Sequence, residues 1–217
     1  MEETKRIPFL KKMIGRVGNP LEWSTVDKCL LIICFWVLLA PFTTLLFHHY
    51  ISNPERIPFF DPVFMKKLLP IGWGFVIAWS ILLVVGLQLR HRSPENSTFA
   101  YVTVFLWWLE EAIVAVCGGP LTTPAAMVLL GQGFVAFLLF RIPVVLVGLG
   151  FALLLVVGAI IASQFGLFPS APLMAAPLYD GGRLVNLWAF LAGPIYLIMY
   201  LGFLSLSAYI ITRWRDR

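Results

Sequence analysis

Charged residues are scarce in this sequence. They make up 12% of the 217 residues, whereas 60% are hydrophobic. Soluble domains of average composition contain about 25% charged residues, so this chain lacks the polar side chains needed to cover a single water-soluble core. The same balance excludes intrinsic disorder, which requires low hydrophobicity. The composition therefore predicts a polytopic helical membrane protein, in which lipid solvates the apolar surface.

Cysteines and catalytic motifs are scarce too. Of the three cysteines, Cys29 and Cys34 lie five residues apart in one apolar run and Cys117 is distant, so neither a zinc spacing nor a disulfide framework is expected. No HExxH, GxSxG or P-loop motif occurs, and no cytoplasmic cluster of carboxylates is placed to hold magnesium. We therefore expect no catalytic residue, no metal and no cofactor in this chain. The sequence favours sensing, binding or transport over catalysis.

Six apolar runs are suited to cross a membrane as helices, for which about 20 residues are needed. They cover residues 26–47, 69–89, 99–117, 124–140, 143–164 and 187–212. We predict an all-α fold with a bundle of six transmembrane helices over residues 26–212. Residues 1–25 form a basic amphipathic segment that either lies on the membrane surface or frays as a tail. Residues 213–217 begin a cytoplasmic helix.

Local signals mark where several of these helices begin and end. Ser24 and Asp27, three residues later, match a capping box at the start of the first helix. Residues 90–94 stop the second helix, and the Gly-Gly-Pro sequence at 118–120 stops the third. Pro143 suits the first turn of the fifth helix. Because the connection before it is very short, the fourth and fifth helices should form a tight antiparallel hairpin.

The basic residues predict the orientation of the bundle. With the N-terminus in the cytoplasm, 12 of the 16 Lys and Arg residues lie on the inner side, as the positive-inside rule requires. Both termini are then cytoplasmic, and the net charge of +5 reflects topology rather than nucleic-acid binding. Two long connections, residues 48–68 and 165–186, fall on the outer side. We expect a short interfacial helix over residues 63–68 in the first of them.

Two carboxylates inside the third span, Glu110 and Glu111, are the strongest functional signal. An ionisable residue in a span costs at least about 2.5–3.5 kcal/mol on insertion scales, so it normally faces the bundle interior, a water-filled cavity or a partner. Adjacent side chains point about 100° apart on a helix, so at least one carboxylate should meet a neighbouring helix or a dimer partner. With Trp107 and Trp108 beside them, they predict a pocket with an apolar wall and a polar anchor. The alternative is a structural interhelical hydrogen bond.

Other polar residues lie near the ends of the spans. His48 and His49 end the first span on the outer side, whereas His91 lies at the opposite membrane surface. Adjacent histidines do not share a helix face, so we expect an interfacial role or a pH-sensitive contact with the outer loops rather than a metal site. Asp180 and Arg183 precede the last span. They either pair with each other to close the outer loop or offer a charge to a ligand carboxylate or headgroup.

The end of the sequence predicts a route for signal transmission. Pro194 lies inside the last span and predicts a kink there. The span runs into the charged sequence at residues 213–217 with neither a glycine cap nor a proline stop, so the helix could continue into the cytoplasm. Movement of the sixth helix would then pass directly into a cytoplasmic helix.

Four segments carry a resemblance to a known group of proteins. They are GPLTTP at 119–124, Phe140 with Arg141, FGLFPSAPL at 165–173, and RWRDR at 213–217. These segments resemble the six-helix N-terminal sensory regions of bacterial membrane-bound nucleotide cyclases, which include class III adenylate cyclases and GGDEF-type diguanylate cyclases. The resemblance implies a homodimer in the bacterial inner membrane. It also implies that the last arginine-rich segment leads into a coiled-coil transducer and a cyclase domain following Arg217.

These observations predict a dimeric membrane sensor domain that binds an apolar or amphipathic, lipid-like ligand and regulates a cytoplasmic nucleotide cyclase domain. The candidate ligand-binding residues are Glu110, Glu111, Trp107, Trp108, His48, His49 and Arg183. The candidate residues for signal transmission are Pro194, Arg213, Trp214 and Arg215. There are three alternatives. The first is a small transporter or solute-binding membrane subunit, the second a small intramembrane enzyme or redox protein, and the third a passive anchor that dimerises the output domain.

Overall fold

The computed structural model describes residues 20–56, 60–119, 125–169, 171–174, 179–180, 183–184, 201–202, 205 and 209. Within these residues the chain forms five α-helices, which are α2 (Thr25–Ser52), α3 (Pro62–Arg92), α4 (Ser97–Gly118), α5 (Ala125–Leu139) and α6 (Ile142–Gln164). Two 3-10 helices, η1 (Pro20–Glu22) and η2 (Pro54–Arg56), flank α2. Two short strands, β1 (Tyr179–Asp180) and β2 (Arg183–Leu184), follow α6.

Four of these helices, α2, α3, α4 and α6, are long and apolar enough to cross a membrane, judged by length and composition. The fifth, α5, has 15 residues. The helical fold class and the membrane-protein character predicted from the sequence are therefore confirmed. The count of six helices is not confirmed, because the described part of the chain holds five, and most of the predicted span at 187–212 lies outside it. The sidedness of the two termini stays a prediction.

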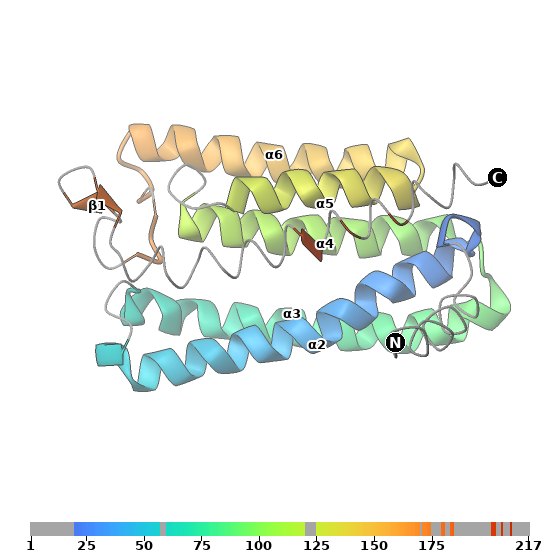
Figure 1. Cartoon of the computed structure of the whole chain (residues 1–217), viewed down its shortest axis with the longest axis horizontal. Coiled ribbons are helices and arrows are strands. Elements are labelled where there is room, and N and C mark those ends of the chain that lie inside the picture. The colour runs from blue at the N-terminus through green and yellow to red at the C-terminus, as the bar shows by residue number, and fades with distance from the viewer. Residues whose placement is uncertain are drawn as a thin grey trace, which may run out of the picture.

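The helices form two layers (Figure 1). Helices α2 and α3 pack along each other in one layer, and α4, α5 and α6 make the other. Helix α4 packs most extensively on α6 and also contacts α2, α3 and α5. Its central position makes α4 the helix on which the two layers meet.

Capping residues explain where the helices begin and end. The Ser24 side chain accepts a hydrogen bond from the Asp27 amide at the start of α2, as predicted. Asn96 caps α4 in the same way through the Phe99 amide. Gly119 ends α4 with a φ of 87°, a left-handed conformation that favours glycine. The predicted cap at Ser24 and the predicted stop at residues 118–120 are therefore confirmed, whereas the cap at Asn96 was not predicted.

The predicted interfacial helix over residues 63–68 is wrong, because these residues are the first turns of α3. The Asp61 carboxylate accepts hydrogen bonds from the amides of Val63 and Phe64, and Pro62 occupies the first turn, so the helix starts well before the apolar run. The helix therefore extends beyond the apolar run and includes Lys66 and Lys67. Helix α2 likewise continues to Ser52.

The interior of the bundle is apolar and rich in tryptophan. Its largest aromatic side chains are Trp36, Trp79, Trp107 and Trp108. The outward faces of the same helices carry exposed apolar side chains, such as Leu38 (77% exposed) and Leu154 (74% exposed). Helices that are apolar on all sides are expected when one face packs on protein and the other on lipid.

Candidate functional site

The two carboxylates of α4 lie inside the bundle. Glu110 and Glu111 are each 7% exposed. The Trp79 Nε1 group of α3 donates a hydrogen bond of 2.6 Å to Glu110 Oε2. The expectation that one of the two carboxylates meets a neighbouring helix is therefore confirmed, and the partner is the indole of a buried tryptophan.

The hydrogen-bonded tryptophan also joins α2 to this site. The rings of Trp79 and Trp36 stack with their centroids 6.0 Å apart and their planes 11° from parallel. Trp36 belongs to α2, Trp79 to α3 and Glu110 to α4. One polar contact and one aromatic stack therefore connect three helices at a single level of the bundle. We call Trp36, Trp79 and Glu110 the tryptophan–carboxylate relay.

The sequence analysis missed both Trp79 and Trp36. A usable signal was present, because each lies within an apolar span rather than near its end, and a buried indole N–H usually has a hydrogen-bond partner. A carboxylate in another span, such as that of Glu110, could have been proposed as the acceptor for one of these indole N–H groups. What the sequence lacked was the relative register of α3 and α4, which decides which tryptophan reaches Glu110.

The second face of α4 packs against the hairpin of α5 and α6. Trp108 is fully buried, and its ring fills space that is open because Gly148 has no side chain, whereas a side chain at Gly133 would make only ordinary contact with the ring. A side-chain carbon at Gly148 would lie 3.1 Å from Trp108 Cγ, and one at Gly133 would lie 3.4 Å from Cη2. The Trp108 ring thus packs α4 closely against α5 and α6. Trp107, 4% exposed, lies one turn before Glu111 on the same helix.

Further polar groups lie in the same interior. Gln132 of α5 is fully buried, and neither its amide oxygen nor its amide nitrogen has a hydrogen-bond partner among the residues described. The indole N–H groups of Trp36 and Trp108 are also buried without a partner there. Each such group costs about 1–3 kcal/mol. The largely apolar interior around α4 therefore contains several polar groups without a partner among the described residues.

The remaining candidate residues are dispersed. His48 and His49 lie in the last turns of α2 and are exposed, and the His49 ring is 6.0 Å from that of Tyr50. Within the described residues, no group of three or more His, Cys, Asp or Glu side chains could hold a metal ion. Arg183 lies opposite Asp180 in the register of β2 and β1, and the predicted pairing of their side chains stays a prediction. Pro194, Arg213, Trp214 and Arg215 lie outside the described residues.

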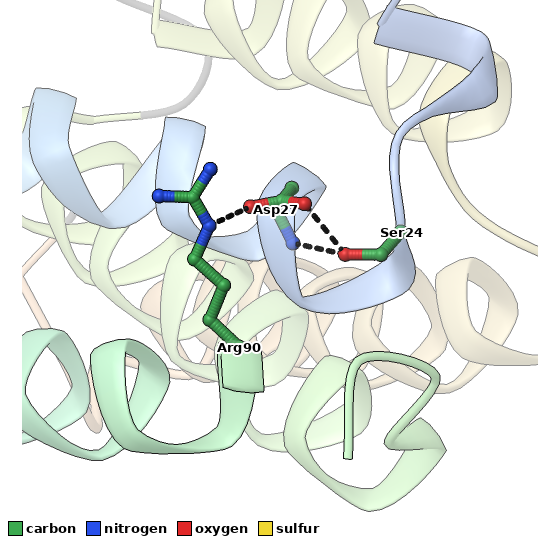
Figure 2. Close-up of polar contacts among 3 residues, drawn as sticks. All are labelled: Ser24, Asp27 and Arg90. Atoms are coloured by element: carbon green, nitrogen blue, oxygen red, sulfur yellow. Dashed lines mark hydrogen bonds and ion pairs between the residues drawn. The ribbon is translucent and has the colours of Figure 1, made fainter. Parts of the chain in front are cut away.

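A polar network ties α2 to α3 at the opposite end from the histidines (Figure 2). Arg90 Nε lies 2.8 Å from Asp27 Oδ1, while the Ser24 hydroxyl donates to Asp27 Oδ2 at 2.8 Å. The Val26 amide donates to the Pro94 carbonyl at 2.9 Å, which attaches the α3–α4 connection to the start of α2. The predicted cytoplasmic end of the bundle is thus held together by ionic and main-chain contacts.

Comparison with known proteins gives no match to any protein-family model, curated protein or solved structure. The class that the fold defines is a helical membrane protein, on the strength of four apolar helices.

Proposed function

We propose that this chain is a membrane sensor domain that binds an apolar or amphipathic ligand and regulates a nucleotide cyclase domain following Arg217. The tryptophan–carboxylate relay is the observation that carries the proposal. A buried hydrogen bond between Trp79 and Glu110 links α3 to α4, and a stack between Trp36 and Trp79 links α2 to α3. The nucleotide cyclase domain is included in the proposal because the loop segments resemble the sensory regions of membrane-bound cyclases.

The relay supports sensing because its contacts depend on how the helices sit against one another. A ligand shifts a conformational equilibrium only by binding one arrangement better than another. Sliding α4 past α3 would separate Trp79 Nε1 from Glu110 Oε2 and leave both groups unpaired in an apolar interior. The paired and the shifted arrangements of α3 and α4 would therefore be two distinct states separated by an energy cost, and a sensor requires two such states. An apolar or amphipathic ligand fits a bundle whose helices are apolar and whose interior holds a few polar side chains, such as Glu110 and Gln132.

Transmission to the cytoplasm is the second part of the proposal. We assign the end bearing Asp27 and Arg90 to the cytoplasmic side of a bacterial inner membrane, because most Lys and Arg residues gather there under the positive-inside rule. The sixth predicted span, with its kink at Pro194, would carry the movement to Arg213, Trp214 and Arg215. The active unit would be a homodimer, because the cyclases that the loop segments resemble act as dimers.

A fusion protein tests the proposal. The chain is joined after Arg217 to the catalytic domain of a class III adenylate cyclase and produced in bacteria that lack their own enzyme. Cyclic AMP is then measured per mole of fusion protein in isolated membranes, with and without added lipid extract. We expect Glu110→Gln and Trp79→Phe to change the response to lipid. Trp73→Phe is the matched control, because Trp73 lies on α3 as well but is 40% exposed.

Two results would overturn the proposal. One is an unchanged response in both relay variants. The other is full, lipid-regulated output from a fusion in which an unrelated dimeric coiled coil replaces the whole membrane region, since that would leave the bundle no role beyond dimerisation.

A further inference from the structure

Residues 171–174, which we call the strap, connect α3 and α4 at the histidine-bearing end of the bundle. The Leu173 amide donates a hydrogen bond of 3.0 Å to the Cys117 carbonyl. The Leu173 carbonyl accepts one of 2.9 Å from the Asp61 amide, and Phe60 forms an antiparallel bridge with Met174. Three segments that are far apart in the sequence therefore meet at Leu173.

The strap binds to groups that the helices leave free. The Cys117 carbonyl belongs to the last turn of α4, where a helix has no internal partner for its C=O groups. Asp61 is the N-cap of α3, so its amide also lies outside the helical hydrogen-bond pattern. Water can satisfy both groups equally well when the strap is absent. The main-chain contacts therefore allow the strap to detach without leaving a buried polar group unpaired.

Two neighbouring side chains of the strap, Pro172 and Leu173, are buried. Leu173 is 8% exposed and packs with Met65 and Cys117 in a small apolar cluster that is separate from the main core. This end cluster includes residues from α3, α4 and the strap, with partly buried side chains of α2 around it. Removing Leu173 from it would open a path from water to the Cys117 thiol, which is 7% exposed.

The same loop carries two exposed apolar side chains between α6 and the strap. Phe165 is 76% exposed and Leu167 is 81% exposed. Gly166 between them adopts a φ of +69°, which turns the chain directly after α6. No charged residue occurs between Gln164 and Met174. Since α6 is a candidate membrane span, this turn lies where the span leaves the hydrocarbon, and its side chains suit the bilayer interface.

We infer that the strap is a releasable latch over this end of the bundle, closed by Leu173 and kept closed by insertion of Phe165 and Leu167 into the bilayer interface. The structure shows the closed state. In the open state Leu173 leaves the end cluster, and Cys117 becomes accessible from water. The inference goes beyond the proposed function and does not depend on a cyclase or on the relay, because it requires only that α6 spans a bilayer.

The Cys117 thiol reports directly on the latch. Cys29 and Cys34 are replaced by serine, and the whole chain is placed in nanodiscs of phosphatidylcholine and phosphatidylglycerol, which leave both faces open to the solvent. The rate of Cys117 modification by a membrane-impermeant maleimide is then measured. We expect slow labelling of this parent protein. Labelling should be roughly tenfold to hundredfold faster in Leu173→Ala, because a buried leucine side chain contributes about that factor to an equilibrium.

Matched variants separate the latch from general loosening of the bundle. Leu154→Ala alters an exposed leucine of α6 outside the strap and should leave the labelling rate unchanged. The double variant Phe165→Ser, Leu167→Ser should accelerate labelling in nanodiscs. Far-UV circular dichroism checks that each variant keeps its helices.

A cysteine at the latch position provides a test that keeps the end cluster apolar. In Leu173→Cys, the new thiol replaces a side chain that belongs to the same small cluster as Cys117, and the backbones of the two residues are hydrogen-bonded. Mild oxidation should form a disulfide that locks the strap, and reduction should restore maleimide labelling. Failure of this disulfide to form would overturn the inference. So would a Leu173→Ala rate equal to that of the parent, and an unchanged rate in the serine double variant would overturn the role of the bilayer.

Discussion

Replacing Trp79 by phenylalanine should destabilise the bundle more than the same replacement at Trp36. Both tryptophans are buried and stack on each other at 6.0 Å, so the loss of ring volume is similar at the two positions. Only Trp79 donates a hydrogen bond to Glu110. The Trp36 indole N–H has no partner among the described residues. The difference between the two variants therefore combines the loss of the Trp79–Glu110 hydrogen bond with the removal of an unpaired, buried indole N–H at Trp36.

The hydrogen bond alone sets an expected difference of at least about 1 kcal/mol. Interhelical hydrogen bonds in membrane proteins contribute about 0.6 kcal/mol on average and at most about 1.7 kcal/mol. The 2.6 Å distance from Trp79 Nε1 to Glu110 Oε2 indicates a strong contact, so we expect the upper half of the membrane range. An equilibrium constant for unfolding would change about fivefold.

The assay is reversible unfolding by sodium dodecyl sulfate in mixed micelles, followed by far-UV circular dichroism, so that the signal does not depend on the replaced tryptophans. A double-mutant cycle with Glu110→Gln adds a second measure of the coupling. The reasoning would be refuted by a Trp79→Phe variant that is no less stable than Trp36→Phe, or by a coupling energy of zero in the cycle.

Two further predictions use the same unfolding assay. Gly148→Ala should cost about 1–3 kcal/mol, because its new carbon would press on the Trp108 ring, whereas Gly150→Ala, which meets no atom within 4 Å, should be neutral or slightly stabilising. A Gly148→Ala variant as stable as the parent protein would mean that the Trp108 ring does not pack closely against Gly148 of α6. Arg90→Ala should cost about 1 kcal/mol or less, because its side chain is 54% exposed where it pairs with Asp27, and this cost should shrink as salt is added. A cost that is independent of salt would argue against an ionic contribution.

Helix boundaries were largely predictable from the sequence because they depend on neighbouring residues. The cap formed by Ser24 and the glycine stop at Gly119 each act within one helical turn, so the signal lies within a few positions. The start of α3 was missed because hydropathy marks where lipid begins rather than where a helix begins. Asp61 carried the correct signal, since it precedes Pro62 and can cap the amides that follow.

The candidate site was only half predictable. Glu110 and Glu111 stand out in any sequence scan because a carboxylate is rare and costly in an apolar span. The partner of Glu110 could not be read in the same way, because α3 contains two tryptophans, Trp73 and Trp79, in equally apolar surroundings. The structure leaves Trp73 40% exposed and buries Trp79 completely. Trp79 lies deeper in the predicted span than Trp73, but the sequence does not show which face of α3 turns toward α4.

The sequence by itself determined the class of protein and the approximate position of its helices, because the requirement for about 20 apolar residues per span acts locally along the chain. Only the tertiary structure decided which face of each helix turns inward. Ile33 is fully buried and Leu38 is 77% exposed, although both are aliphatic residues of α2. In water, polarity would distinguish the two faces, but lipid solvates an apolar face as well as protein does. The inward face is therefore set by shape and by a few polar contacts, such as the one between Trp79 and Glu110, which exist only when the helices are packed together.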